Sequence, residues 1–547
     1  MEVKRRELFQ LSNFFFKGFL FGIKDSDIES HVLNEFNKKG KEALKQLNGS
    51  FCGWLADEQK QLLYVFNDRL GMADLFLMQE GDNWLITDDY WLAVKELSEV
   101  SVNETAIEQL LQFGYMHWEN TYLNEIKLCT PATIITIDLS GNAITSIEQY
   151  WHHKPQAVIT NYSAAREQTT ELIRNAVKEC FVEPDATYAV ANSGGLDSRW
   201  NLFFASQQKQ NFLSYTYTGS DNSDATHISR KINETLGLSN TDYIQISTND
   251  FIANYAGIHM SKTPMLPMYS TWYYDAHKRL SDLDININGF ISTFLDAFTY
   301  MDGAENYAEF ENKAITDKHE YCYSLYKPAV TELVNKVYKK QNSGRAKEAF
   351  MASLETLDMN DVGDICDTFD FYCRQRRLNK NEPWTDYYGQ LKSRSPLCHN
   401  AIVDFSLALP FQMRDDRILY KDAAAEVMTS LQKVRFERSP WGLKGKEKGT
   451  AALVKDVLWR ADMKLYKKTG HSFWFKGSHK NVAEWMCQSP NIDFIRNVIN
   501  SENPLIEERF DQDYLNKHLE ALIKKDFVFM SSLLTIFMFF NKLTDIK

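Results

Sequence analysis

The sequence predicts an α/β protein with two domains, a strand-rich N-terminal domain over residues 1–155 and a parallel-sheet domain over residues 156–547. Up to about residue 155, short apolar runs alternate with turns, a pattern typical of paired β-strands. Between residues 187 and 288, short strands alternate with helices, which indicates βαβ units and a parallel sheet. From residue 305 onward the pattern is mainly helical, so the second domain is expected to include a helical C-terminal part.

Several strands of the first domain are visible as local patterns. Residues 51–55 and 62–66 are aromatic-rich apolar runs that flank the charged tip 57–60, which predicts a β-hairpin. Further strands are expected at 84–87 and at 133–137. The run 133–137 is rich in β-branched residues, which favour strands. The pattern loosens around 155–165, and a helix is expected to follow up to residue 180.

In the second domain, we expect strands at 187–191, 212–218, 243–246 and 285–288, with helices between them. The longest apolar run, 527–540, is short for a membrane span and is interrupted by Ser531, Ser532 and Thr535. We therefore expect a buried helix there, and we expect no membrane partner.

Composition limits the classes of function. The chain has 547 residues, 44% of them hydrophobic, and a formal charge of −12, which disfavours nucleic acid as a main partner. Its eight cysteines are scattered, with no Cys-x-x-Cys pair and no His/Cys cluster at metal-ligand spacing. Because this distribution suits a reducing compartment, and because no secretory signal pattern is found, a cytoplasmic protein is expected. A homodimer is compatible with these observations.

The strongest chemical signal is the segment 193–198, with the sequence Ser-Gly-Gly-Leu-Asp-Ser. Gly194 and Gly195 allow a sharp turn and a close approach of backbone N–H groups to a ligand. The helix that follows directs its positive end toward the same place, which favours an anion. Ser193 and Ser198 can add hydroxyl donors, and Asp197 can hold Mg²⁺ together with phosphate oxygens. The alternative is a capped strand-to-helix turn without ligand, but the full string after a first parallel strand favours phosphate binding.

Tyr217 and Thr218 end the second predicted strand of the sheet. Ligands of this fold class bind at the carboxyl ends of parallel strands, so these two residues are predicted to contact the adenine of a nucleotide.

The 193–198 string resembles the pyrophosphate-binding loop of the asparagine synthetase family, whose relatives include β-lactam synthetase and lasso-peptide cyclases. The resemblance continues outside the loop. Residues 47–51 and 67–71 resemble the "NGxF…RDRLG" signature of the family's glutaminase domain, and residues 120–131 resemble the stretch leading out of it. Residues 395–397, 404–405 and 409–410 resemble the family's "RxPFLD…LP" segment. The match runs from roughly residue 40 to residue 445.

This resemblance implies a truncated Ntn-type αββα sandwich, a degenerate glutamine amidotransferase-like domain, over residues 1–155. It implies an adenine-nucleotide α-hydrolase-like synthetase domain over residues 156–547. Family members use ATP and Mg²⁺ to adenylate a carboxylate, here aspartate by default, and form an amide, releasing AMP and pyrophosphate. Gly289 fits the first glycine of a later family loop, and Asp296 is a candidate second metal ligand beside Asp197, with a purely structural role as the alternative.

The sequence also departs from the family pattern. Met1 is followed by Glu2, and Cys52 lies within a strand pattern, so no glutaminase activity is expected. Lys392 stands where a glutamate is expected near the amine site, and a cation cannot replace a proton-accepting carboxylate. Arg438 stands where relatives place a catalytic lysine, with Lys444 as a nearby alternative. A surface ion pair is the other interpretation of Arg438.

Three hypotheses of function follow. The first is an ATP-dependent carbon–nitrogen ligase that takes a small-molecule or peptide carboxylate and an amine or ammonia. The second is an intramolecular amide-forming cyclase of the β-lactam synthetase or lasso-peptide cyclase type. The third is a catalytically degenerate nucleotide-binding scaffold, suggested by the altered residues at Thr293, Lys392 and Arg438.

Overall fold

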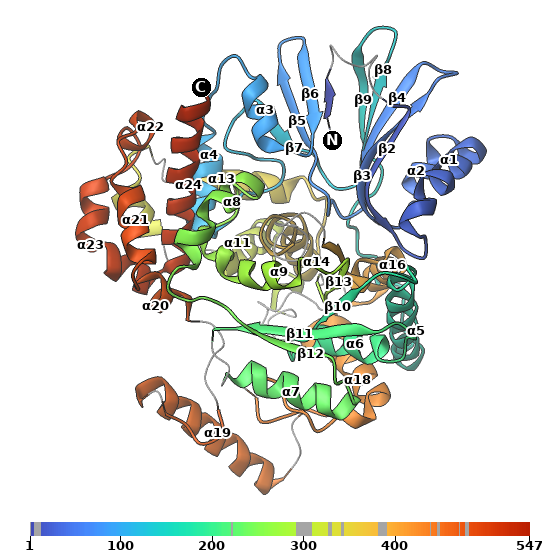
Figure 1. Ribbon diagram of the computed structural model, residues 1–547, viewed down its shortest axis with the longest axis vertical. Coiled ribbons are helices and arrows are strands. Elements are labelled where there is room, and N and C mark those ends of the chain that lie inside the picture. The colour runs from blue at the N-terminus through green and yellow to red at the C-terminus, as the bar shows by residue number, and fades with distance from the viewer. Residues whose placement is uncertain are drawn as a thin grey trace.

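The computed structural model describes residues 2–4, 12–219, 223–290, 309–326, 331–340, 344–380, 391–437, 439–445, 449–469, 471–475 and 481–547. Two stacked antiparallel sheets form the upper part of the molecule in Figure 1, and a parallel sheet surrounded by helices forms the lower part. The α/β fold class predicted from the sequence, with antiparallel sheets first and a parallel sheet later, is therefore confirmed.

The N-terminal domain consists of two antiparallel sheets. One sheet has the order β2-β3-β4-β8-β9. The other has the order β1-β6-β5-β7. The strands are β1 (Glu2–Lys4), β2 (Phe14–Leu20), β3 (Gly49–Asp57), β4 (Leu62–Asn67), β5 (Phe76–Glu80), β6 (Asn83–Thr87), β7 (Ile126–Leu128), β8 (Thr133–Asp138) and β9 (Ala143–Gln149).

Helices cover the outer face of each sheet, which gives the expected αββα layering. The buried residues between the sheets include Trp54, Val65, Leu77 and Ile86. The helices are η2 (Asp25–Asp27), α1 (Ile28–Lys39) and α2 (Glu42–Lys45) on the first sheet, and α3 (Tyr90–Glu96) and α4 (Glu104–Phe113) on the second.

The second domain is built on a five-stranded, fully parallel sheet with the order β12-β11-β10-β13-β14. Side chains alternate between its faces, as strand geometry requires. Tyr188 and Val190 face α5, α6 and α18, whereas Ala189 faces α9. The strands are β10 (Tyr188–Ala191), β11 (Phe212–Thr218), β12 (Thr241–Gln245), β13 (Ile285–Ile287) and β14 (Lys392–Arg394).

Helices flank this sheet and continue beyond it. Those up to β13 are α5 (Tyr162–Cys180), α6 (Leu196–Ala205), α7 (Asp224–Leu236), α8 (Phe251–Lys262), η3 (Met268–Tyr273) and α9 (Tyr274–Leu280). Those after it are α11 (Ile315–Tyr326), α12 (Thr331–Val337), α13 (Arg345–Glu355), α14 (Val362–Phe369), the π-helix η5 (Asp370–Asn379), η6 (Pro396–Cys398), α16 (Asn400–Ala408), α17 (Phe411–Arg414), η7 (Asp415–Arg417), α18 (Ile418–Val427), η8 (Thr429–Leu431), α19 (Thr450–Thr469), α20 (Val482–Met486), α21 (Asn491–Ile499), α22 (Pro504–Glu507), α23 (Gln512–Lys525) and α24 (Phe527–Ile546).

Helix α24 packs against elements of both domains. Its Phe539 ring stacks on Tyr122 with the ring centroids 3.8 Å apart and also contacts Trp91. One helical turn earlier on the same side, the Thr535 hydroxyl donates to the carbonyl oxygen of Leu266 at 3.1 Å. Within the described part of the chain, α24 is the one helix whose length and apolar composition would allow a membrane crossing, and 67% of its most apolar window is buried inside the protein.

The locally patterned elements agree with the sequence-based expectations. The hairpin predicted around 57–60 is β3 and β4, and the four strands predicted for the parallel sheet are β10, β11, β12 and β13. The fifth strand, β14, was not predicted. It has three residues and pairs with β13 through Lys392 and Ile285 at one end, so it carries no periodic pattern of its own.

Candidate functional site

The 193–198 loop lies at the place where this kind of sheet binds ligands. From β10 the chain builds outward on one side to β11 and β12, and then returns to the other side as β13. The order of strands therefore reverses between β10 and β13, and a crevice at the carboxyl ends of such strands is the usual ligand position in open α/β sheets. The loop follows β10 directly, and Asn288 and Gly289 follow β13.

Glycines give the loop its shape. Gly194 has φ +77, in the left-handed region, and a Cβ there would lie 2.8 Å from Ile228. Gly195 is the N-cap residue of α6, and the helix has no side-chain cap, so its first N–H groups are available to a ligand. An uncapped helix N-terminus behind two glycines can bind an anion through backbone N–H groups and the helix dipole.

The polar side chains of the loop gather around this N-terminus. The hydroxyl oxygens of Ser193 and Ser198 lie 3.1 Å apart, and Ser198 donates to the carbonyl oxygen of Gly195 at 3.0 Å. Gly289 packs directly on the loop, because a Cβ at this glycine would lie 2.8 Å from Cβ of Asp197 and 3.1 Å from the Ser198 nitrogen. The structure thus brings Ser193, Gly194, Gly195, Asp197, Ser198 and Gly289 together, as the sequence predicted.

A buried arginine beneath the loop was missed by sequence reasoning. Arg199 is 0% exposed and donates from Nε to the carbonyl oxygen of Gly194 at 3.1 Å. Its two terminal nitrogens donate to the carbonyl oxygens of Val434 and Arg435 at 2.7 and 2.6 Å, and its guanidinium lies 4.1 Å from the Phe436 ring. Burial lowers the pKa of Arg199 to about 9. This side chain ties the loop to a segment far away in the sequence.

Two further arginines lie near the loop. Arg435 forms an ion pair with the buried carboxylate of Asp224 at the start of α7. Arg417 approaches Asp197, with Nη1 at 3.9 Å from the carboxylate oxygen. Asp416 and Arg417 have φ values of 48 and 59, a left-handed conformation that is costly for residues with a Cβ. These two strained residues place a cation beside the loop.

The residues predicted to contact adenine are more enclosed than expected. Thr218 is 0% exposed, and its hydroxyl donates at 3.0 Å to Ser223, the N-cap residue of α7. The ring of Tyr217 is half-buried and contacts Trp272 at 5.2 Å between ring centroids. Both residues end β11 at the same edge of the sheet as the loop.

The other predicted site residues are more scattered. Lys444 is exposed in the turn between Gly442 and Gly445. Asp296 and Arg438, with Thr293, lie outside the described residues. Lys392 begins β14, at the amino end of the sheet, and its ammonium pairs with Asp25 of the N-terminal domain. Lys392 therefore lies at the sheet edge opposite the 193–198 loop.

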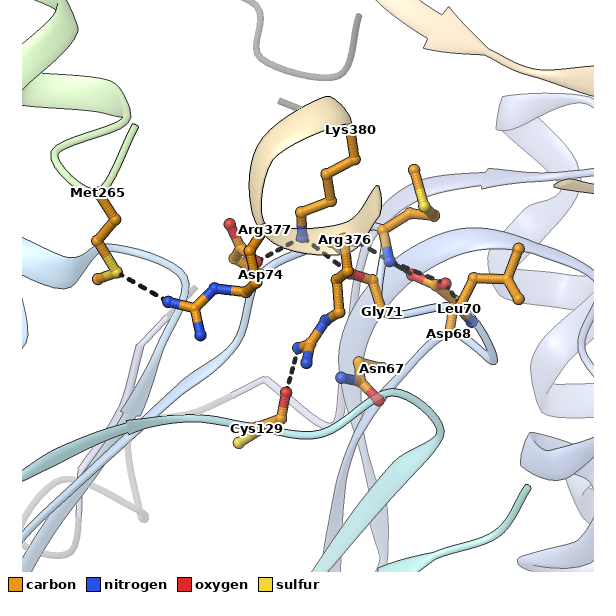
Figure 2. A network of polar contacts seen from close by, with 12 residues as sticks. Asn67, Asp68, Leu70, Gly71, Asp74, Cys129, Met265, Arg376, Arg377 and Lys380 are labelled. Atoms are coloured by element: carbon orange, nitrogen blue, oxygen red, sulfur yellow. Dashed lines mark hydrogen bonds and ion pairs between the residues drawn. The ribbon is translucent and has the colours of Figure 1, made fainter. Parts of the chain in front are cut away.

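The signature residues of the N-terminal domain have a structural role. The carboxylate of Asp68 is 0% exposed and accepts hydrogen bonds from the backbone N–H groups of Phe51, Leu70, Met72 and Ala73, at 3.0 to 3.1 Å. A carboxylate with several backbone donors fixes the turn that follows β4. Figure 2 shows this turn beside the cations of helix η5.

Those cations connect the turn to the helical part of the chain. Lys380 donates to the carbonyl oxygen of Gly71 at 2.9 Å, and Arg376 donates to that of Cys129 (Figure 2). Arg377 donates to the carbonyl oxygen of Asn120 at 2.7 Å. All three cationic side chains are buried, and burial lowers the pKa of Arg377 to about 10. The network holds the two domains together and encloses the signature turn.

The cysteines are largely enclosed in this structure. Seven of the eight are buried, and Cys487 is half-buried. Burial raises the pKa of Cys52 to about 12, so its thiol stays protonated at neutral pH. The prediction that Cys52 is a buried strand residue is confirmed.

Comparison with known proteins finds similarity over part of the chain. A glutamine amidotransferase domain model matches residues 20–151, which cover most of the sandwich. A putative glutamine-hydrolyzing asparagine synthetase 2 from Methanocaldococcus jannaschii is 28% identical over 171 residues, 30% of this chain and 33% of the relative. The glutamine-hydrolyzing asparagine synthetase 3 of Bacillus subtilis is 26% identical over 178 residues, 32% of this chain and 28% of the relative.

Part of this chain is similar to asparagine synthetases. Its matches span about a third of the length of these asparagine synthetases (33% and 28%). A solved glutamine phosphoribosylpyrophosphate amidotransferase of Bacillus subtilis covers 43% of the chain and 70% of its own length, but at a TM-score of 0.18 and 8% identity it carries no argument.

The residues of the loop fit a magnesium nucleotide. Gly194 packs on Ile228 and Gly289 packs on Asp197, so neither position has room for a side chain. The N-terminus of α6 beside them has no side-chain cap, and its N–H groups are the kind of donors that phosphate groups require. Within the described ranges, no group of three or more His, Cys, Asp or Glu residues is arranged to hold a metal ion. The single carboxylate of Asp197 suits Mg²⁺, which is usually bound by one or two carboxylates and by phosphate oxygens of the nucleotide.

Proposed function

We propose that this asparagine synthetase relative is an ATP-dependent ligase that forms an amide from a carboxylate and an amine or ammonia. The observation that carries the proposal is the uncapped N-terminus of α6, closed on one side by Gly194 and on the other by Gly289, at the strand reversal of the parallel sheet. Adenylation depends mainly on phosphate positioning and electrostatic stabilisation, which N–H groups and nearby cations supply.

In the proposed reaction, an oxygen of the carboxylate attacks the α-phosphorus of ATP and pyrophosphate leaves. An amine nitrogen then attacks the acyl carbon, loses a proton, and releases AMP. Loop N–H groups and the hydroxyls of Ser193 and Ser198 hold the phosphates, and Asp197 holds Mg²⁺, which neutralises phosphate charge when bound. Arg417, and the predicted cations Lys444 and Arg438, stabilise the negative charge that develops. Aspartate is the default carboxylate.

The proposal includes the absence of glutamine hydrolysis. Burial raises the pKa of Cys52, Cys129 and Cys180 to about 12, so thiolate is scarce at these positions. The nitrogen would then come from free ammonia or an amine substrate. Formation of glutamate from glutamine by the wild type, lost in Cys52→Ala, would contradict this part of the proposal.

A second candidate function, a nucleotide-binding scaffold without amide formation, is favoured by one observation. Lys392 replaces the glutamate expected at the amine site and pairs with Asp25 at the opposite edge of the sheet. A general base for the attacking amine is thus missing at this position. The two candidates differ in turnover, because a scaffold binds ATP without releasing pyrophosphate.

The first experiment compares thermal stability with and without Mg-ATP for the wild type, Asp197→Ala and Asp282→Ala. Asp282 is an exposed aspartate after α9 and serves as the control. A ligand at a hundredfold excess over its Kd stabilises the folded state by about 2.7 kcal/mol. We expect this shift in the wild type and in Asp282→Ala, and its loss in Asp197→Ala. No shift in any of the three at millimolar nucleotide would refute nucleotide binding.

The second experiment measures pyrophosphate release with a panel of carboxylates and amines, and identifies products by mass spectrometry. Amide formation between two substrates supports the ligase, whereas a product that has only lost water supports the cyclase alternative. ATP binding without pyrophosphate release across the panel supports the scaffold.

A further inference from the structure

Helix α19 has apolar side chains on two faces, of which one is exposed. Ala452 and Trp459 are buried against the protein. Residues one and two helical turns apart on another face are exposed, with 57% of Leu453, 65% of Val457 and 37% of Leu465 accessible. Val454 and Leu458 border the same face and are 57% and 47% exposed. Spacings of three and four residues place all five on one side of a helix.

Individual side-chain contacts hold the inner face of the helix. The indole N–H of Trp441 donates to Asp456 at 2.6 Å, and the guanidinium of Arg435 lies 4.8 Å from the centroid of the Trp459 ring. Figure 1 shows α19 at the lower end of the molecule, beyond α7 and away from the antiparallel sheets. A helix in this position can meet a flat surface without obstruction from the N-terminal domain.

An aromatic turn extends the exposed apolar face. The carboxylate of Asp462 accepts hydrogen bonds from the backbone N–H groups of residues 473, 474 and 475, at 2.6 to 2.9 Å. These bonds fix the turn after the helix, and they leave Phe473 74% and Trp474 50% exposed. Exposed large aromatic rings of this kind are costly in water and are typical of interfaces.

The charges of this surface are of one sign. The exposed charged side chains of α19 for which the structure gives a burial are basic: Lys455, Arg460, Lys464 and Lys468. Its two acidic residues, Asp456 and Asp462, are engaged on the inner side by Trp441 and by the aromatic turn. The whole chain, in contrast, has a formal charge of −12. A local basic face on an acidic protein attracts an anionic surface only at short range, since screening confines it to about 10 Å.

We propose that α19 and the turn at 473–474 form a docking surface for an anionic lipid bilayer. An apolar helix face bordered by Lys and Arg, with Trp and Phe at one end, is the pattern of helices that lie in the membrane interface. The basic side chains complement anionic headgroups, and the apolar stripe with its two rings enters the acyl boundary. This surface alters the sequence-based expectation of no membrane partner, and it concerns a helix that the apolar-run analysis did not detect.

The test is flotation of the full-length protein with vesicles of phosphatidylcholine alone or of phosphatidylcholine with 30% phosphatidylserine (about one lipid in three, chosen to give a clear surface potential). We expect binding to the anionic vesicles at low salt and little binding to the neutral ones. Val457→Asp is expected to weaken vesicle binding about tenfold, because it places a negative charge in the apolar stripe. Lys464→Glu is also expected to weaken vesicle binding about tenfold, because it replaces a positive charge by a negative one.

Matched controls are available elsewhere on the molecule. Val158→Asp makes the same change at a valine with 67% exposure outside α19, and Lys209→Glu reverses an exposed charge in the turn after α6. Both controls should bind vesicles like the wild type, and thermal unfolding should confirm that all four variants are folded. Equal binding by Val457→Asp and Val158→Asp would overturn the proposal, as would failure of the wild type to bind anionic vesicles.

A protein interface is the competing explanation for this apolar face. Sedimentation equilibrium distinguishes it, because a dimer through α19 would dissociate in Val457→Asp and persist in Val158→Asp. That result, together with absence of vesicle binding by the wild type, would assign the surface to a second copy of the chain and overturn the lipid assignment.

Discussion

In the N-terminal sandwich, the residues that resemble a family signature are bonded inward, whereas those of the parallel-sheet domain lie at an open sheet edge. Asp68 is 0% exposed and its oxygens accept backbone hydrogen bonds, and the turn around it is enclosed by Lys380 and Arg376. Ser193, in contrast, is exposed, and the α6 N-terminus has no side-chain cap.

This difference separates two uses of similar sequence signals. Buried, fully bonded polar groups maintain a fold, since leaving one unpaired costs more than the bond contributes. Uncapped backbone groups at a strand end are available to a ligand. In the first domain the retained signature therefore reflects structure, and in the second it is available for chemistry. The predictions below test this division, starting with the largest expected effect.

Replacing Asp68 by alanine should destabilise the protein strongly without changing nucleotide affinity. The substitution leaves several buried N–H groups without an acceptor, so we expect a loss of about 3–4 kcal/mol in the free energy of unfolding. Urea denaturation measures this loss, and Glu234→Ala, which removes an exposed pair with Lys231, should change stability by less than about 0.5 kcal/mol. A stable Asp68→Ala variant that no longer binds Mg-ATP would break the comparison.

In the second domain, Gly289→Ala should abolish Mg-ATP binding while the protein remains folded. Its new Cβ would lie 2.8 Å from Cβ of Asp197 and 3.0 Å from the Asp197 carbonyl carbon, and a backbone atom cannot move aside cheaply. We expect a destabilisation of about 1–3 kcal/mol and loss of the Mg-ATP thermal shift. Gly257→Ala is the matched control, because a Cβ there meets nothing within 4 Å and should stabilise α8 by about 0.5–1 kcal/mol. Unchanged Mg-ATP binding in Gly289→Ala would show that the contact between Gly289 and Asp197 is not part of the nucleotide site.

Acid should lower the stability of the folded protein, because His117 is buried in its neutral form. This histidine is 1% exposed among the rings of Phe113, Tyr115, Phe350 and Phe369, and burial lowers its pKa to about 3. In the unfolded chain its pKa is near 6.5, so between pH 6.5 and 3 the unfolded state binds the extra proton and stability falls as pH falls.

From pH 7 to pH 5 this histidine should account for a loss of about 2 kcal/mol. Denaturation midpoints at the two pH values measure it. His117→Leu should show a smaller loss on acidification than the wild type, and His471→Leu, at an exposed histidine, should behave like the wild type. Identical acid sensitivity of His117→Leu and the wild type would show that His117 is not the cause.

The smallest expected effect concerns Arg417. Its distance of 3.9 Å to Asp197 and its side-chain exposure of 31% indicate a weak ion pair, so Arg417→Gln should raise the Kd for Mg-ATP by about threefold. Isothermal titration calorimetry measures this change. Arg279→Gln, at an exposed Arg–Asp pair on α9, is the matched control and should leave the Kd unchanged. Tighter binding in Arg417→Gln would mean that Arg417 competes for the Asp197 carboxylate.

Local patterns predicted the parts of the fold and the site that depend on neighbours in sequence. The hairpin of β3 and β4 and the strand, turn and helix around 193–198 follow from runs of fewer than twenty residues. Gly289 was also identified, although its contact with Asp197 is long-range, because the family resemblance supplied it.

The remainder depends on contacts that no local pattern records. Arg199 bonds to carbonyl oxygens of residues 434 and 435, and Arg417 reaches Asp197 only because residues 416 and 417 adopt left-handed backbone angles. β14 has three residues and exists as a strand only through β13. Lys392 was assigned to the amine site by its position in a motif, and the pairing of β14 with β13 places it at the other edge of the sheet.

The position of α24 has a consequence for synthesis of the protein on the ribosome. Trp91 and Tyr122 of the first domain are covered by Phe539, which is translated far later than they are. Until that helix emerges, the apolar surface beneath it stays exposed on the nascent chain, a state prone to aggregation. The first domain can therefore form its sheets early but is completed only when the second is nearly finished, so we expect molecular chaperones to bind this surface during translation.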